Sequence, residues 1–171
     1  FAFCGTVTTP EIAERSRGTK GLPWAGTYSQ DPLPSAVALK QLQIVLRDDL
    51  AGHAANAGAF LEQRLAELTE KYDCIGDIRG RGLYRMMDIV TDGKSKEPDA
   101  EMGEAIRYHA MAEGVTMIVV KNYARICPPT IITKDQLDDI VGRLDTAIAR
   151  AVRGEPVPTN ISRSSSLATN N

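Results

Sequence analysis

The chain has 171 residues, of which 43% are hydrophobic and 25% are charged, a composition typical of a soluble globular protein. Its 20 basic and 22 acidic side chains form no basic stripe with interleaved aromatic residues, which argues against nucleic acid as a partner. No apolar run reaches the roughly 18 residues that a membrane span needs, so we expect no membrane association.

The first part of the chain predicts one short strand and three helices. The apolar run at residues 1–7 predicts a buried strand, and the Thr-Pro pair at 9–10 is typical of a helix start. A loop rich in Gly and Pro follows at residues 16–26. Two further helices are predicted at residues 32–49 and 51–71, each with an apolar side suited to burial.

The second part predicts a sheet with two more helices. Residues 72–90 read as a strand with a glycine-rich approach, and a turn-rich loop follows. A helix is predicted at 100–113, ending at Gly114, and short strands at 115–120 and 124–129. The last helix begins at Thr133, which has capping-box spacing to Gln136. From residue 51 onward the pattern predicts helices on one side of a small, mostly antiparallel sheet, an α+β domain.

Several residues are more simply explained by structure than by chemistry. The glycines of "IRGRG", residues 78–82, lack the strand-loop-helix context of a dinucleotide site, so we interpret them as allowing close backbone approach. His53 and His109 stand alone in helical patterns, and we interpret neither as a metal ligand. Cys127, beside two prolines, is interpreted as a packed, inert thiol.

The cysteines also bear on the compartment. Cys4, Cys74 and Cys127 are odd in number and far apart, which argues against a disulfide framework and against a zinc site. Such usage is typical of a reducing environment, so we expect a cytoplasmic protein.

Arg125 leaves two interpretations open. It lies in a short strand that is expected to be largely buried, where an unpaired guanidinium would be very costly. Either it forms an internal salt bridge, or its planar fork binds a substrate carboxylate. The sequence gives the salt bridge at least equal weight.

The hydroxyl-rich stretch "GTYSQDPLP", residues 26–34, leaves three interpretations open. Thr27 and nearby backbone N–H groups could hold a phosphate oxygen. Asp31, together with carbonyl oxygens of the turn, could bind a hard cation. Asp31 could also simply accept hydrogen bonds from local N–H groups.

Four stretches resemble the class III aminotransferases, which use pyridoxal 5'-phosphate (PLP): "GTYSQDPLPSAVAL", "DCIGDIRGRGL", "IVTDGKSKEP" and "RICPPTIITKDQLDDIV". In order and spacing they account for nearly everything from residue 1 to about 152. Within the class, "DPLPSAVAL" and "DCIGDIRGRGL" followed by "KEP" look most like the dialkylglycine decarboxylases. Most members have a small residue and then His-Pro or Asn-Pro where this chain has Asp31 and Pro32.

The resemblance implies an α/β fold, the C-terminal part of the PLP-dependent transferase fold type I. Residues 1–49 would be the end of the PLP-binding large domain and an interdomain helix. Residues 50–153 would be the small α+β domain with its antiparallel sheet. Residues 154–171 would be a disordered tail.

The resemblance also implies roles for single residues. Thr27 would bind the phosphate of the PLP held by the other subunit of a homodimer. Backbone oxygens of Thr27 and Ser29 and the carboxylate of Asp31 would hold an alkali-metal ion, potassium. Arg125 would bind the carboxylate of the amino acid or keto acid substrate.

The activity implied is decarboxylation-dependent transamination of an amino acid, with a keto acid as acceptor. The lysine that forms the Schiff base in the family would lie upstream of Phe1, so no catalytic residue is expected within the chain, which alone should be inactive. The alternatives are an ordinary ω-aminotransferase without decarboxylation, and a non-catalytic dimerisation module.

Overall fold

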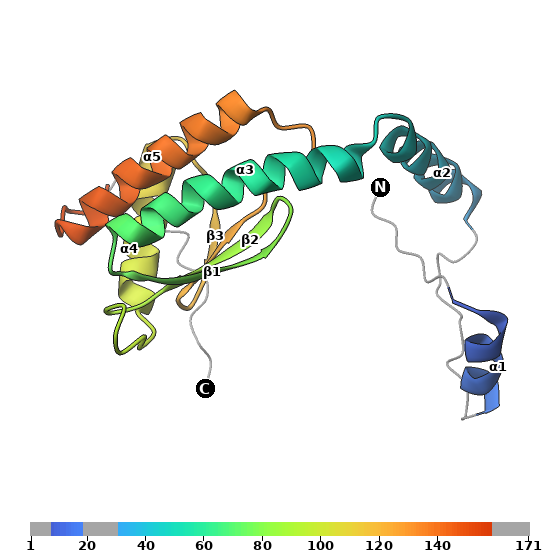
Figure 1. Ribbon diagram of the computed structural model, residues 1–171, viewed down its shortest axis with the longest axis horizontal. Helices are drawn as coiled ribbons and strands as arrows, with labels where there is room; N and C mark the ends of the chain where they lie inside the picture. Colours follow the sequence, from blue (N-terminus) through green and yellow to red (C-terminus); the bar gives the residue numbers. More distant parts are fainter. Residues whose placement is uncertain (1–7, 19–30, 159–171) are drawn as a thin grey trace. The chain divides into compact units, whose positions relative to one another are not determined.

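The structure is a computed structural model, and it describes residues 8–18 and 31–158 (Figure 1). Contacts divide the chain into two compact units, Phe1–Asp49 and Leu50–Asn171. The predicted strand at residues 1–7 and most of the predicted loop at 16–26 lie outside the described residues. The assignment of the two units to a large and a small domain stays a prediction.

The first unit contributes two described helices. Helix α1, Pro10–Gly18, begins as predicted, because the hydroxyl of Thr9 accepts a hydrogen bond from the amide of Ile12 at 3.4 Å. It extends to Gly18, so residues 16–18 are helical rather than loop. Helix α2, Pro32–Arg47, confirms the helix predicted at 32–49. The leucines along α2 are exposed: Leu33, Leu39, Leu42 and Leu46.

The second unit contains a four-stranded antiparallel sheet, as predicted (Figure 1). Its strands are β1 (Ile75–Arg81), β2 (Tyr84–Ile89), β3 (Ile118–Val120) and β4 (Tyr123–Ile126), in the order β1-β2-β4-β3. Residues 75–89 form a hairpin, which corrects the single predicted strand with a glycine-rich approach. Strand β3 is also shorter than the predicted run of residues 115–120.

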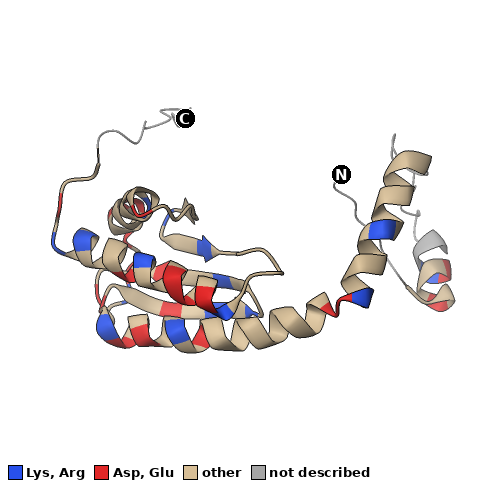
Figure 2. Cartoon of the chain, turned by 90° about the horizontal axis from the view of Figure 1, so that it is seen from above, with Lys and Arg blue, Asp and Glu red and all other residues tan. Residues whose placement is uncertain are grey.

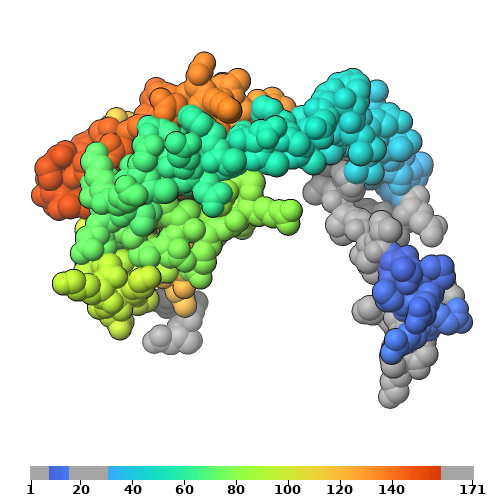
Figure 3. Space-filling view, viewed as in Figure 1, coloured from blue at the N-terminus to red at the C-terminus, as the bar shows by residue number. Residues whose placement is uncertain are grey.

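Three helices cover one face of this sheet: α3 (Leu50–Lys71), α4 (Ala100–Ala112) and α5 (Lys134–Val152) (Figure 1). Helix α5 starts with the predicted capping box of Thr133 and Gln136, and Gly114 after α4 has a φ of 82°, as a left-handed helix end requires. Leucines of α3 and α5 and inward residues of β2 form the core: Leu61, Leu65, Leu137, Leu144, Met87 and Ile89. Figure 3 shows α3 and α5 packed against one another.

Polar contacts join α3 to α5 at the surface. The side chain of Lys71 lies 2.7 Å from a carboxylate oxygen of Asp145, and the Tyr72 hydroxyl donates to the same carboxylate at 2.6 Å. Burial alone would raise the pKa of Asp145, but the hydrogen bonds from Lys71 and Tyr72 outweigh it and hold the pKa below its usual value. Acidic and basic residues are interspersed along both helices (Figure 2). None of the described helices is long and apolar enough to cross a membrane.

The turn of the β1–β2 hairpin lies directly against α3. Gly82 in the turn has a φ of 56°, and a Cβ added to Gly58 of α3 would overlap the Gly82 backbone. The two glycines therefore allow the helix and the turn to touch backbone to backbone. This confirms the interpretation of "IRGRG" as a site of close backbone approach.

We expect Gly58→Ala to lower the free energy of unfolding by about 1–3 kcal/mol, because the new methyl group meets backbone that cannot move aside. The matched control is Gly142→Ala in α5, where an added Cβ meets nothing within 4 Å. That change should stabilise the chain by up to about 1 kcal/mol through helix propensity. Urea unfolding followed by circular dichroism measures both; equal effects of the two substitutions would contradict the close contact.

Candidate functional site

The sheet has one face against the helices and one open face. Successive residues of a strand point to opposite faces, and in β4 Ala124 and Ile126 are buried in the core. Tyr123 and Arg125 therefore belong to the open face. Met86 of β2 and Ile118 of β3 are opposite Arg125 in the ladders on its two sides. The open face is partly apolar, since Ile118 is 50% exposed.

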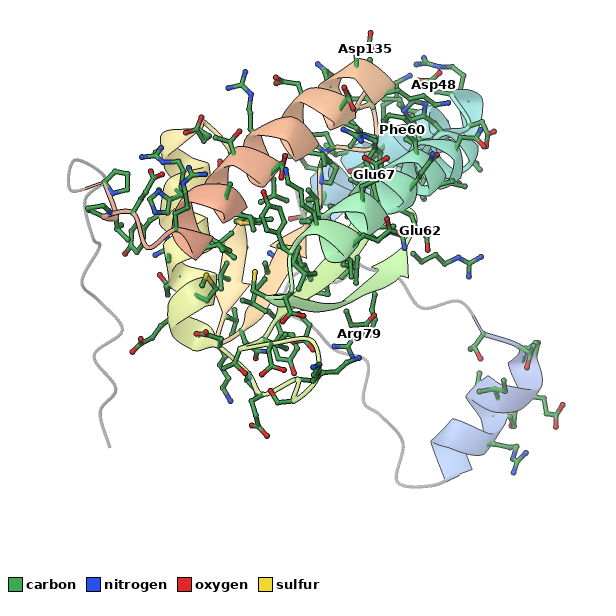
Figure 4. All side chains as sticks on the ribbon, turned by 60° about the vertical axis from the view of Figure 1, so that its left-hand side comes forward. Asp48, Phe60, Glu62, Glu67, Arg79 and Asp135 are labelled. Carbon is green, nitrogen blue, oxygen red and sulfur yellow. The ribbon has the colours of Figure 1, made fainter. Side chains whose placement is uncertain are left out.

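Arg125 is half-buried on this face, and its guanidinium forms no ion pair or hydrogen bond with any residue that the structure describes. Arg79, on the same face, is instead paired with Asp77 at 3.2 Å and Asp88 at 3.5 Å. Figure 4 shows Arg79 on the side of the sheet away from α3. Within the described ranges, the internal salt bridge considered for Arg125 is not formed, and its guanidinium is available to an anion.

Arg85 is a second buried arginine, and sequence reasoning missed it. It is 4% exposed, and its ladder partner is Ile126, so it points into the core side of the sheet. Its guanidinium donates to the carbonyl oxygens of Gly82, Gly80 and Gly58 at 3.0, 3.3 and 3.2 Å. It also pairs with Glu62 of α3 at 2.9 Å, and Glu62 extends toward the hairpin (Figure 4).

The roles of the two arginines therefore differ. The guanidinium of Arg85 donates to groups of the fold. The guanidinium of Arg125, one ladder position away on the neighbouring strand, donates to no described residue. A signal for Arg85 was present in the sequence. The other inward positions of its strand are the apolar Met87 and Ile89, and a buried guanidinium requires acceptors.

A cavity of about 300 Å³ adjoins Arg125. Its lining is mostly apolar and comes from the ends of β3 and β4 and from α5: Gly114, Val115, Thr116, Met117, Ile126, Cys127, Pro128, Pro129, Ile140 and Leu144. Cys127 is exposed, which corrects its interpretation as a packed thiol. Of the two cysteines within the described ranges, Cys74 is the buried one, and burial raises the pKa of its thiol.

The residues of the predicted cofactor and metal sites are described only in part. Thr27 and Ser29 lie outside the described residues. Asp31 is the N-cap of α2, and its Oδ1 accepts a hydrogen bond from the amide of Leu33 at 3.0 Å. This local capping contact is one of the three roles considered for the stretch. A potassium site that includes Thr27, Ser29 and Asp31 stays a prediction.

The two histidines have structural partners. The Nε2 atom of His53 lies 2.9 Å from the carbonyl oxygen of Ile132. His109 is fully buried, with Nε2 3.2 Å from the carbonyl oxygen of Glu155 and with no partner for Nδ1. Among the described residues, no three His, Cys, Asp or Glu side chains lie together as a metal site would require.

Residues just after α5 contact the last turns of that helix. Glu155 forms ion pairs with Arg150 at 2.9 Å and Arg153 at 2.7 Å. The disordered tail expected for residues 154–171 stays a prediction. These two arginines lower the pKa of the Glu155 carboxyl, Arg153 more strongly. Residues 159–171 lie outside the described ranges.

Comparison with known proteins gives the family. The sequence model of the family described as aminotransferase class III matches residues 1–148. This chain belongs to the class III aminotransferases. The family is PLP-dependent, and the fold is that of its C-terminal part, as predicted. The likeness to the dialkylglycine decarboxylases in particular is taken up below as a proposal.

Curated relatives with different activities are similar to this chain. Isoleucine 2-epimerase of Lentilactobacillus buchneri is 35% identical over 130 residues, which are 75% of this chain and 29% of that protein. An Arabidopsis thaliana protein, alanine–glyoxylate aminotransferase 2 homolog 2, mitochondrial, is 30% identical over 159 residues, 88% of this chain and 31% of that protein. The chain thus spans less than a third of the length of these relatives.

Solved structures of transaminases have the same fold. A thermostable omega transaminase mutant from Pseudomonas jessenii matches 84% of this chain and 32% of its own, with 29% identity and a TM-score of 0.72. An amine transaminase from an uncultivated Pseudomonas species, in its PLP-bound form, matches 76% of this chain and 30% of its own, with 34% identity and a TM-score of 0.72.

We expect Arg85→Met to lower the free energy of unfolding by at least about 2 kcal/mol, because the carbonyl groups it serves lose a charged donor. Glu62→Gln should cost less than about 1 kcal/mol, since the Glu62 side chain is 64% exposed. Urea unfolding of both variants measures the difference. If Arg85→Met were as stable as the parent chain, the hairpin would be held by packing alone.

Proposed function

We propose that residues 1–171 are the C-terminal part of a PLP-dependent aminotransferase that moves an amino group between an amino acid and a keto acid. In this enzyme Arg125 binds the substrate carboxylate. The observation that carries the proposal is the state of Arg125: half-buried on an open sheet face, beside a cavity, and without a partner among the described residues. Family membership supports it.

The chain's own residues would bind and orient rather than break bonds. PLP, when bound, supplies the electron sink of the reaction. Thr27 would hold its phosphate across the interface of a homodimer, and Arg125 would fix the substrate carboxylate at two points, which orients the bond to be broken. Thr27 lies outside the described residues, so this cofactor contact rests on the sequence resemblance alone.

The finer proposal is decarboxylation-dependent transamination of a dialkylglycine. The stretches "DPLPSAVAL" and "DCIGDIRGRGL" followed by "KEP" support it. The similarity to omega and amine transaminases favours a second candidate, an ω-aminotransferase without decarboxylation. The two candidates are distinguished by incubating the complete enzyme with a 2,2-dialkylglycine and a keto acid. Release of one carbon dioxide for each keto acid consumed supports the decarboxylating enzyme. A complete enzyme that consumes amine and keto acid without releasing carbon dioxide identifies the second.

Asp31 is expected to make the activity of the complete enzyme greater in potassium than in sodium, because oxygen ligands that suit the larger ion leave the smaller one under-coordinated. Asp31→Asn should abolish this preference. This substitution should leave the start of α2 intact, because asparagine also caps helices well, so a changed ion response would report on the carboxylate. Rates are measured in matched potassium and sodium buffers. Equal rates of the unaltered enzyme in both buffers would remove the metal from the proposal.

Arg125→Lys is expected to reduce kcat/KM for substrates with a carboxylate by about tenfold or more, because lysine keeps the charge but loses the two-point contact. Stability should change little, since no described residue pairs with Arg125. The matched control is Arg143→Lys in α5, whose side chain is 49% exposed and paired with Asp139. That variant should keep full activity.

Steady-state kinetics and thermal unfolding of both variants test this assignment. An Arg125→Lys enzyme that mainly unfolds, and that still uses amines lacking a carboxylate as before, would mean that Arg125 is a structural residue.

A further inference from the structure

A cavity of about 300 Å³ lies between two segments that separate at the end of the sheet. Residues 114–117 lead into β3 and residues 126–129 leave β4, beyond the last pair of the β3–β4 ladder. Ile140 and Leu144 of α5 close the cavity on the helix-covered side. The cavity thus lies under α5, away from the open face of the sheet.

The enclosed part of the cavity is apolar. Side chains alternate between the two faces along an extended chain, so Val115 and Met117 point to the same side as the buried Ile126. Arg125 is also a lining residue, but the same alternation places its guanidinium on the open face. The other described residues of the lining are all uncharged. A ligand under α5 would therefore meet no charged side chain of the described lining.

The size of the cavity suits one small ring. A volume of about 300 Å³ is at the small end of the range for sites of small molecules. It is roughly twice the volume of about 150 Å³ at which an apolar cavity in a protein core stays dry and binds benzene. A ring with one or two small substituents therefore fits this space.

Sulfur atoms in the lining favour an aromatic ring over a saturated one. Met117 and Cys127 both line the cavity, and Cys127 is exposed at its solvent side. Divalent sulfur makes favourable contacts with the edge of an aromatic ring. None of the described lining residues is itself aromatic, so the ligand would supply the ring for these contacts.

We infer that this cavity binds a small neutral aromatic molecule, with its ring enclosed by Met117, Ile126 and Leu144. The inference is independent of the proposed function, because it uses no contact of the Arg125 guanidinium. An ionic group that entered the cavity would leave water without meeting a partner, so charged relatives of the ligand are rejected. A saturated ring of the same size lacks the sulfur contacts and binds about twofold to tenfold more weakly.

The test is an NMR titration of the 171-residue chain, labelled with 13C at its methyl groups, with toluene. Toluene should shift the methyl resonances of Met117, Ile126 and Ile140. Benzoate and benzylammonium carry the same ring with a negative or a positive charge, and each should bind there at least about tenfold more weakly. Methylcyclohexane should bind about twofold to tenfold more weakly. Shifts of Met86 and Ile118 on the open face report contacts outside the cavity.

Two variants with a matched control examine the site itself. Ile140→Phe fills part of the cavity from a half-buried position and should abolish the shifts caused by toluene. Met117→Leu keeps an apolar side chain of similar size but removes the sulfur. It should lower the affinity for toluene about twofold to tenfold and leave that for methylcyclohexane unchanged. Met86→Leu on the open face should change neither affinity, and circular dichroism confirms that each variant is folded.

Equal binding of toluene and benzylammonium at the cavity methyl groups would overturn the inference. Toluene shifts confined to the open face, or none at the highest soluble concentration, would also overturn it. Equal affinities for toluene and methylcyclohexane, both unchanged by Met117→Leu, would overturn the choice of an aromatic ligand. If Ile140→Phe does not fold, Met117→Leu and the location of the shifts in the unaltered chain still decide.

Discussion

The backbone contact between Gly58 in α3 and Gly82 in the hairpin turn is the constraint on which the rest of the second unit depends. Because neither residue has a side chain, the helix lies close enough for Arg85 to reach acceptors on both elements. That contact fixes which face of β2 is turned toward the core. Strand β4 pairs with β2, so residues that are paired in the two strands lie on the same face of the sheet. Arg125, paired with Met86, therefore lies on the open face.

The parts of this fold that the sequence predicted correctly are those decided by nearby residues. Thr9, the Thr133–Gln136 pair and Gly114 each act within four residues of the helix end they define. Their hydrogen bonds and backbone angles need no information from elsewhere in the chain. The apolar stripes of α3 and α5 could also be predicted from the sequence, because helical periodicity is a local property.

The errors concern features decided by distant residues. A glycine-rich segment was not recognised as strand β1, since its pairing with β2 and its contact with α3 decide its conformation. Arg85 could not be identified from its neighbours in the sequence, because two of its acceptors, Glu62 and Gly58, lie 23 and 27 residues away. Cys127 was expected to be packed, yet the segment after β4 leaves the sheet and exposes it. The sequence could name Arg125 as a candidate, but only the structure shows which neighbours it lacks among the described residues.

The strand order has a consequence for how such a site can change over evolution. Strand β4 lies inside the sheet, hydrogen-bonded to β2 on one side and β3 on the other, so Arg125 is held in register from both sides. The cavity walls at residues 114–117 and 127–129 belong instead to connecting segments, which tolerate sequence change better than paired strands. Mutations there can change the shape of the cavity while Arg125 keeps its position in the sheet. The surroundings of Arg125 can therefore vary without any change in the paired strands that carry it.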